Sequence, residues 1–234
     1  MINVMHSAQQ KILAIDRERI VCEYMLKDKN AVIIHGGGSK TQRKKYYCIA
    51  DELLRHDIGY ILFDLSGHGE SSGKLEELSL ERRKLQTIGV ISTLIPNDST
   101  FYLIGFSMGA HTVCDLLPHY GGRVESILLG CPAIYRADVQ SLPFGTDTFT
   151  DKLREPNSWQ STNATKYLAD FGGKTVICIG DNDDIIPQDV IEMLRATTKN
   201  LAFVELKGAT HALMSWLPEH PEMLNVLVSS LVKD

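Results

Sequence analysis

Short continuous runs of apolar residues, separated by longer stretches with helical spacing, constrain the fold of this chain more than any other feature. Runs of four to six residues without polar alternation are typical of strands that are buried on both faces, as in a parallel sheet. Five strongly apolar runs and a sixth, less apolar one lie at residues 31–34, 60–63, 101–104, 126–129, 176–179 and 201–206.

The stretches between these runs carry apolar residues at helical spacing. Candidate caps precede two of them, Ser39 and Thr41 before the first and Ser79 before the second. Pro187 suits the first turn of another. Helices are therefore expected over residues 46–54, 85–95, 110–117, 187–194 and 219–233.

Alternating strands and helices are the signature of an α/β fold, a mostly parallel sheet covered by helices on both faces. The beginning of the chain differs from this pattern. Residues 11–15 and 19–25, separated by Asp16-Arg17-Glu18, predict an antiparallel hairpin at one edge of the sheet.

Residues 132 to about 160 do not fit the alternation, and the segment is long for a loop in a compact domain. We therefore expect a single domain over residues 1–234 with a small cap at about 132–160. The segment's large apolar side chains either line an acyl or aryl pocket or form a satellite core. The pocket candidates are Leu142, Phe144, Phe149 and Trp159, together with Gly36 and Met214 from outside the segment.

Charge and composition exclude several classes of protein. The chain has 24 Lys plus Arg against 29 Asp plus Glu, a net charge of −5, which disfavours nucleic-acid binding. No apolar run reaches about 18 residues, so no membrane span is expected. Five scattered cysteines without a CxxC pair favour free thiols, a reducing compartment and no zinc site. With no secretory signal at the start, these features predict a cytoplasmic protein.

The pattern G-x-S-x-G occurs as Gly-Phe-Ser-Met-Gly at residues 105–109. It directly follows the apolar run 101–104 and precedes the expected helix 110–117, which we expect Pro118 to end. A strand, a sharp turn and a helix are what a nucleophile elbow requires. This arrangement would expose the Ser107 hydroxyl at the carboxyl end of the sheet, where open α/β sheets place their sites.

A serine nucleophile needs a base within hydrogen-bond reach and an acid that orients the base. Of the histidines after Ser107, which are His111, His119, His211 and His220, only His211 follows the last expected strand. The base should lie on that loop, so we expect His211 to fill this role.

The acid should follow the preceding strand, where Asp181, Asp183 and Asp184 compete. At least one of the three is expected to serve only an acidic turn or helix cap.

An oxyanion hole needs backbone N–H groups aimed at the developing charge. Met108, directly after the nucleophile, would supply one. The second is expected from His-Gly-Gly-Gly at residues 35–38, after the first central strand, and we favour Gly37. A phosphate-binding loop is the alternative, but neither G-K-[S/T] nor GxGxxG is present.

With these residues identified, the chain resembles the α/β-hydrolase superfamily. It is most similar to the compact branch of serine esterases, monoacylglycerol lipases and serine aminopeptidase-like proteins, which includes bacterial cinnamoyl esterases. The resemblance covers about residues 32–211 and rests on the segments 35–38, 64–71, 105–109, 180–187 and 208–211.

The resemblance implies the α/β-hydrolase fold, with eight strands and a short cap insertion after the sixth. It implies Asp183 as the acid, because the family's acid lies three positions after Gly180 and four before Pro187. It also implies a structural turn at residues 64–71, supported by His68, although this chain has Ser66 where the family often has Arg. Nothing in the pattern requires a metal or cofactor.

The expected function is hydrolysis of small-molecule carboxylic esters with small or medium acyl groups through an acyl-enzyme on Ser107. Thioesterase or acyltransferase chemistry would also be compatible, because a coenzyme A substrate could bind a basic cluster, although a solvated helix face explains that cluster more simply. The cluster comprises Lys40, Arg43, Lys44 and Lys45. Hydrolysis of small peptides and a non-catalytic binding role are also compatible with this fold. The sequence leaves the oligomeric state open.

Overall fold

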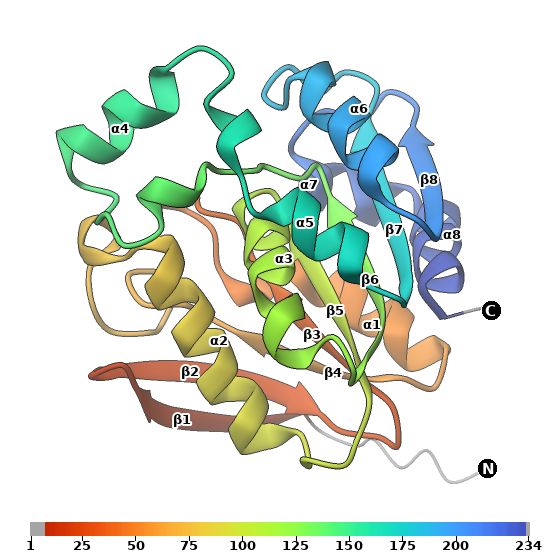
Figure 1. The fold of residues 1–234 in the computed structure, drawn as a ribbon. Helices are drawn as coiled ribbons and strands as arrows, with labels where there is room; N and C mark the ends of the chain where they lie inside the picture. Colours follow the sequence, from red (N-terminus) through yellow and green to blue (C-terminus); the bar gives the residue numbers. More distant parts are fainter. Residues whose placement is uncertain (1–7, 233–234) are drawn as a thin grey trace, which may run out of the picture.

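The computed structural model describes residues 8–232, and the strands of this part form one eight-stranded sheet (Figure 1). The order of the strands across the sheet is β1-β2-β4-β3-β5-β6-β7-β8. Their bounds are β1 Gln9–Ile15, β2 Glu18–Met25, β3 Asn30–Ile34, β4 Gly59–Phe63, β5 Phe101–Phe106, β6 Val124–Gly130, β7 Lys174–Gly180 and β8 Leu201–Leu206. The predicted class of fold is confirmed, since every pairing from β4 to β8 is parallel.

The first two strands form the antiparallel hairpin that the sequence predicts at one edge of the sheet. Its two-residue turn places Asp16 and Arg17 at φ of 53° and 65°. Positive φ at both central positions is the conformation that matches the twist of a tight hairpin. The second strand pairs with β4, also antiparallel, and thereby joins the hairpin to the parallel sheet.

Helices cover both faces of the sheet (Figure 1). On one face lie α1, Tyr47–Arg55, and α8, Pro221–Val232, which pack on each other and on the sheet. The other face carries α2, Leu80–Leu94; α3, Met108–Tyr120; α5, Ala164–Asp170; and α6, Gln188–Thr197. Two separate apolar clusters result, one on each face of the sheet.

Two local expectations about the helices differ from the structure, and one agrees. Pro118 does not end α3, which continues to Tyr120. Because Pro118 is exposed and lies in the last turn, its missing N–H removes little helical hydrogen bonding. Ser39 and Thr41 do not cap a helix, since the chain enters α1 through the 3₁₀ turn Arg43–Tyr46. Ser79 does cap α2, its Oγ accepting from Arg82 N–H at 3.2 Å.

The buried face of α2 only partly follows the apolar pattern, since Ile91 and Ile95 are buried as expected. Leu85, expected on the apolar side, is 46% exposed, whereas Arg83 and Gln86 are fully buried. The buried side of this helix therefore contains polar groups with specific partners, which the site described below explains.

The segment between β6 and β7 is mostly helical. It contains the 3₁₀ turns Ala137–Val139 and Ser158–Ser161, and α4, Asp147–Arg154, which stands apart from the sheet in Figure 1. Phe149 on α4 packs with Leu80 and Val139 in a third apolar cluster, to which Leu142 and Phe144 also belong.

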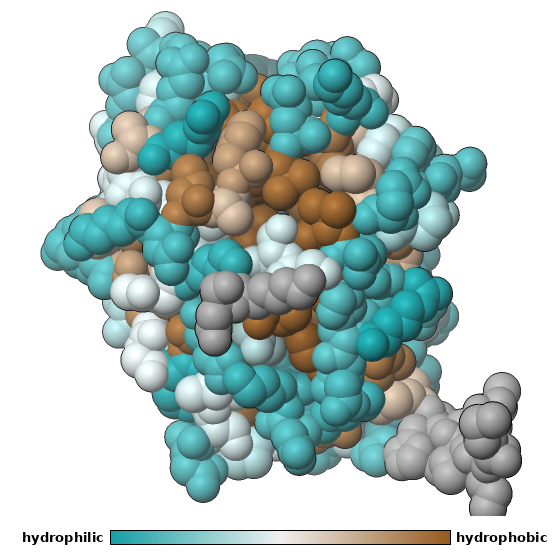
Figure 2. Space-filling model, turned by 90° about the vertical axis from the view of Figure 1, so that its right-hand side faces the viewer, coloured by the Kyte–Doolittle hydropathy of each residue, from teal (hydrophilic) through white to brown (hydrophobic). Residues whose placement is uncertain are grey.

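β8 is the strand at the opposite edge of the sheet. Figure 2 shows apolar side chains gathered on the face that carries α6, β8 and α8. Ile185 and Val226 are the exposed large apolar residues in this half of the described chain, at 62% and 40%. Among residues 8–232, no helix combines the length and hydropathy that a bilayer crossing demands. All five cysteines are free thiols, as predicted.

Candidate active site

Ser107 occupies the sharp turn between β5 and α3. Its φ of 53° and ψ of −123° lie outside the ordinary regions for a residue with a side chain. The two flanking glycines are sterically required. A Cβ on Gly105 would lie 2.4 Å from the Gly109 carbonyl oxygen, and one on Gly109 would lie 2.2 Å from the Ile34 carbonyl oxygen. The motif thus lets β5, α3 and β3 approach closely while the serine faces outward.

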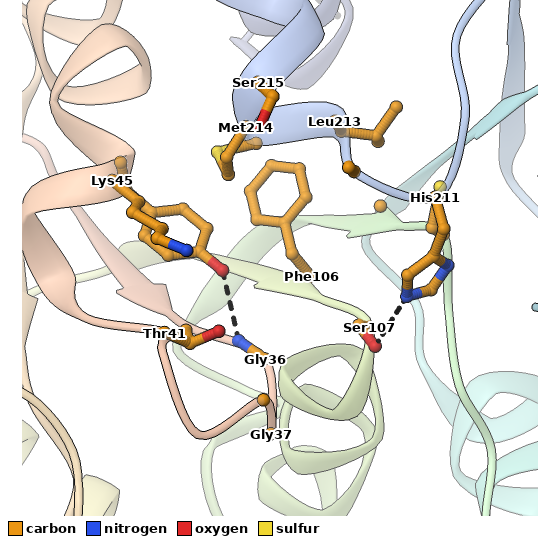
Figure 3. Close-up of a pocket in the computed structure, with 15 residues that line it drawn as sticks. Gly36, Gly37, Thr41, Lys45, Phe106, Ser107, His211, Leu213, Met214 and Ser215 are labelled. Atoms are coloured by element: carbon orange, nitrogen blue, oxygen red, sulfur yellow. Dashed lines mark hydrogen bonds between the residues drawn. The ribbon is translucent and has the colours of Figure 1, made fainter.

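The structure brings Ser107, His211 and Asp183 together, although they come from the ends of three different strands. His211 lies between β8 and α7, Leu213–Trp216, and its Nε2 is 3.0 Å from Ser107 Oγ (Figure 3). Its Nδ1 is 2.9 Å from Oδ2 of Asp183, on the loop after β7. A hydroxyl, an imidazole and a carboxylate in this order are the geometry of a nucleophile activated by an oriented base.

The surroundings of Asp183 keep it ionised. Burial raises the pKa of its carboxyl, but hydrogen bonds from Cys131, His211 and the backbone outweigh burial and hold this pKa below its usual value. The backbone donors are Ile185 N–H at 2.9 Å and Ile186 N–H at 3.1 Å, both to Oδ1. An ionised Asp183 places the imidazole proton on Nδ1 and leaves Nε2 free to accept a proton.

Cys131 is a member of this site that sequence reasoning missed. Its thiol is buried directly after β6 and hydrogen-bonds to Asp183, and burial raises the pKa of the thiol, so that it stays protonated. Ligand atoms of Cys131, Asp183 and His211 lie within 4.8 Å of one another, a spacing that could hold a metal ion. In the structure these atoms are engaged in the hydrogen-bond chain instead.

A cavity of about 280 Å³ opens in front of Ser107 (Figure 3). Its lining includes two of the predicted pocket residues, Gly36 and Met214, and not the other four. Leu142, Phe144 and Phe149 instead form the cluster under α4, with the Phe144 and Phe149 rings 4.9 Å apart, and Trp159 packs against the main core. Apolar contact within these clusters removes the side chains from water, which accounts for their positions away from the pocket. The full lining comprises residues 36–38, Thr41, Lys45, Tyr46, Phe106, Ser107, Gly130, Cys131 and 211–215.

Two backbone N–H groups beside Ser107 are candidates for an oxyanion hole. Met108 begins α3, where the first N–H groups of a helix have no partner within the helix. Gly36 N–H donates to the Tyr46 hydroxyl at 3.1 Å, a bond drawn as the dashed line from Gly36 in Figure 3. Gly37 N–H has no acceptor among the described residues. The loop lies against the nucleophile, since a Cβ on Gly36 would be 3.4 Å from Ser107 Cβ.

Two residues of the predicted basic cluster are already paired with carboxylates. The Arg43 side chain is fully buried and bound to Asp64 and Glu70, and Lys44 pairs with Glu70 at 3.0 Å. Of the four cluster residues, Lys45 alone lines the cavity. His68 is buried in the turn at residues 64–71, its Nδ1 3.1 Å from the Ser66 carbonyl oxygen, which agrees with the structural role that the resemblance implies.

Two comparisons with known sequences indicate the family of this chain. A family model described as serine aminopeptidase, S33, matches residues 27–164. Monoacylglycerol lipase ABHD6 of Bos taurus is 29% identical over 106 residues, which cover 44% of this chain and 29% of the relative. The enzyme of the same name from Homo sapiens is 25% identical over 126 residues, which cover 53% and 34%. The chain therefore matches about a third of the length of these curated relatives.

Solved structures show the same fold at low sequence identity. Est1E from Butyrivibrio proteoclasticus, with bound ferulic acid, has a TM-score of 0.75 at 15% identity, covering 96% of this chain and 100% of that one. A hydrolase from Agrobacterium vitis has a TM-score of 0.74 at 17% identity, covering 97% and 100%. A thioesterase domain from the curacin pathway has 0.72 at 18%, covering 95% and 99%. Because the family model matches more than half of the chain, the chain belongs to the serine aminopeptidase S33 family of α/β-hydrolases.

Proposed function

We propose that this hydrolase cleaves carboxylic esters of small or medium acyl groups, with Ser107 as nucleophile, His211 as base and Asp183 as the orienting acid. The observation that carries the proposal is the continuous chain of hydrogen bonds from Ser107 Oγ through both ring nitrogens of His211 to Asp183. Ser107 and His211 line a cavity that Gly37 also lines, and the Gly37 N–H has no acceptor within residues 8–232.

The reaction follows from the positions of these groups. Ser107 Oγ attacks the ester carbonyl carbon while His211 Nε2 takes the hydroxyl proton, and ionised Asp183 stabilises the resulting imidazolium. The oxyanion of the tetrahedral intermediate accepts hydrogen bonds from Gly37 and Met108 N–H. His211 then protonates the departing alcohol, and a water molecule repeats the sequence on the acyl-enzyme to release the acid.

The lining of the cavity supports esters over the aminopeptidase substrates in the family's description. An aminopeptidase must bind a free α-ammonium group, for which a carboxylate is the natural partner. Within the described part of the chain, Lys45 is the only Lys, Arg, Asp or Glu in the lining, and it would repel such a group. An ester without a positive charge meets no such repulsion. The volume of about 280 Å³ suits small and medium acyl chains.

Labelling with a fluorophosphonate probe, beside turnover of p-nitrophenyl esters of increasing acyl length, tests the proposal. We expect the wild-type protein to be labelled and to hydrolyse short esters best, and Ser107→Ala to lose both properties. Equal labelling of Ser107→Ala would place the nucleophile elsewhere. An aminoacyl p-nitroanilide turned over faster than any ester would favour a peptidase.

A further inference from the structure

Arg83 on α2 is a fully buried arginine without a carboxylate partner. Its relative exposure is 0%, equal to that of Arg43, which is paired with Asp64. Among the residues that the structure describes, none places a carboxylate oxygen within 4.0 Å of the Arg83 guanidinium. A buried, unpaired charge is costly for stability, so a side chain of this kind calls for an explanation.

The partners of Arg83 are the backbone carbonyls of the glycine-rich loop beside Ser107. Nη2 donates to the His35 carbonyl oxygen at 2.5 Å and Nη1 to the Gly36 carbonyl oxygen at 3.3 Å. Nε donates to Thr112 Oγ1 at 3.4 Å, which anchors the guanidinium on α3. Arg83 therefore connects α2 and α3 to the loop that borders the cavity.

These contacts determine the orientation of two successive peptide groups. In a trans peptide, the carbonyl of one residue and the N–H of the next point in opposite directions. The His35–Gly36 peptide is held at both ends, by Arg83 on the carbonyl and by the Tyr46 hydroxyl on the N–H. The Gly36–Gly37 peptide is held at its carbonyl, so the Gly37 N–H points away from Arg83, and no described residue accepts from it.

His35 supports the same carbonyl from a second direction. Leu65 N–H donates to its Nε2 at 3.0 Å, so the ring proton lies on Nδ1, which donates to the Gly36 carbonyl oxygen at 2.7 Å. Burial holds the pKa of His35 well below its usual value, and the ring is neutral. Two donors thus converge on the Gly36 carbonyl, and Arg83 is the charged one.

We propose that Arg83 is a positioning residue of the oxyanion hole, which aims the Gly37 N–H at the substrate and polarises the Gly36–Gly37 peptide. A cation on the carbonyl side of a peptide increases the positive character of its N–H, which strengthens the hydrogen bond to a developing oxyanion. The inference depends on the proposed function, since it assigns a role within the same reaction.

The surroundings of Arg83 leave its charge uncompensated. Burial lowers the pKa of Arg83 to about 10, which still leaves it protonated near neutral pH. Burial lowers the pKa of His111 to about 3 and raises the pKa values of Tyr46 and Tyr135 to about 12, so these neighbours are neutral. The negative charge of the tetrahedral intermediate therefore gains an attraction that the neutral ester lacks.

Substituting Arg83 by methionine tests the role, because methionine has similar length and no charge. Loss of one oxyanion-hole donor costs roughly 10²- to 10³-fold in rate. Because Arg83 acts through Gly37, we expect Arg83→Met to lower kcat by about 10²-fold with KM nearly unchanged. Arg83→Lys keeps the charge but cannot bridge two carbonyls, so it should recover part of the loss.

A comparison of oxygen esters with matching thionoesters separates this role from general damage. The C=S sulfur of a thionoester is a poor hydrogen-bond acceptor, so its hydrolysis gains little from the oxyanion hole. Arg83→Met should therefore slow the oxygen ester much more than the thionoester, and the ratio of the two kcat/KM values should fall about tenfold or more. A variant damaged only in folding would lose both activities in the same proportion.

Two matched controls accompany the measurement. Arg82→Met alters the adjacent arginine of α2, which pairs with Asp16 in the turn between β1 and β2. Arg43→Lys shortens an equally buried arginine whose partners are carboxylates rather than the loop carbonyls. Both should keep the wild-type ratio. The inference would be overturned if folded Arg83→Met kept the wild-type kcat and the wild-type ratio of oxygen-ester to thionoester kcat/KM. It would also be overturned if this ratio fell equally in Arg43→Lys. In both cases the wild type would still hydrolyse esters. A wild type without ester turnover would instead remove the proposed function.

Discussion

At the scale of single residues, the three carboxylates after β7 differ in their hydrogen-bond partners, although the sequence makes them look interchangeable. Asp183 is 2.9 Å from His211 Nδ1. Asp181 accepts from Gly208 N–H at 2.7 Å and so closes the loop that carries His211. Asp184 is exposed. Of the three, Asp183 is the one placed to fix the tautomer of His211, the proposed base.

Replacing each carboxylate by its amide tests this difference. Asp183→Asn should lower kcat by about 10³- to 10⁴-fold, because an amide no longer enforces the productive tautomer. Asp181→Asn should lower it by less than about tenfold, since the amide oxygen can still accept from Gly208. Steady-state kinetics on a p-nitrophenyl ester decide between them, with Asp184→Asn as the control. A larger loss in Asp181→Asn than in Asp183→Asn would contradict the assignment.

The sequence predicts some members of this site and not others, for physical reasons. Ser107 and His211 follow from a motif and from chain order, because strand ends on one edge meet. Asp183 needs the family pattern, since spacing alone does not distinguish it from its neighbours. Cys131 and Arg83 carry no local signal, because their partners, Asp183 and the His35 and Gly36 carbonyls, come from distant segments.

At the scale of secondary-structure elements, strands are easier to predict than helix faces. The central strands β3, β4 and β5 are almost continuously apolar because both of their faces are buried. The face of a helix is ambiguous when polar residues are buried, as on α2, where Arg83 and Gln86 lie inside and Leu85 lies outside. The pattern of apolar residues cannot show that a helix packs against a polar loop.

The turn after β4 offers a stability prediction at this scale. The Arg43 and Asp64 side chains are both fully buried and paired, and Asp64 also accepts from Arg43 N–H at 2.6 Å and Glu70 N–H at 3.1 Å. Arg43→Met leaves a buried carboxylate without its cation and should cost about 3–5 kcal/mol in the free energy of unfolding. Urea unfolding measures this loss.

A double variant shows whether the unpaired charge causes the loss. Asp64→Asn removes the charge but keeps an oxygen for the backbone N–H groups, so Arg43→Met with Asp64→Asn should be more stable than Arg43→Met alone. If the double variant is the less stable of the two, packing of the arginine and not charge pairing is the dominant contribution.

At the scale of the whole molecule, two buried titratable residues of α3, His111 and Asp115, lie where this helix meets the segment after β6. His111 on α3 accepts from Tyr135 N–H at 3.3 Å, and its Nε2 is 2.8 Å from Gln140 Nε2 and 3.5 Å from Asp115 Oδ2. Burial lowers the pKa of His111 from 6.5 to about 3 and raises the pKa of Asp115 from 3.8 to about 7. The two shifts have opposite consequences for stability.

In the wild type these consequences cancel. Between about pH 4 and 6.5 the folded pair carries one proton, on Asp115, and the unfolded pair also carries one, on His111. Because folding then neither takes up nor releases a proton at this pair, the pair adds no slope to the dependence of stability on pH.

Replacing one of the two groups should therefore leave the pH dependence of stability that the other group contributes. In Asp115→Asn, only the unfolded state binds a proton at His111 below about pH 6.5, so the free energy of unfolding should fall by about 1.4 kcal/mol per unit of decreasing pH, relative to the wild type. In His111→Gln, the folded state retains the Asp115 proton, so stability should instead fall as the pH rises from about 4 to 7. Urea unfolding at half-unit steps from pH 4.5 to 7 measures both slopes. Parallel curves for the wild type and both variants would mean that neither group is desolvated in the folded molecule, and that the junction between α3 and the segment after β6 admits water.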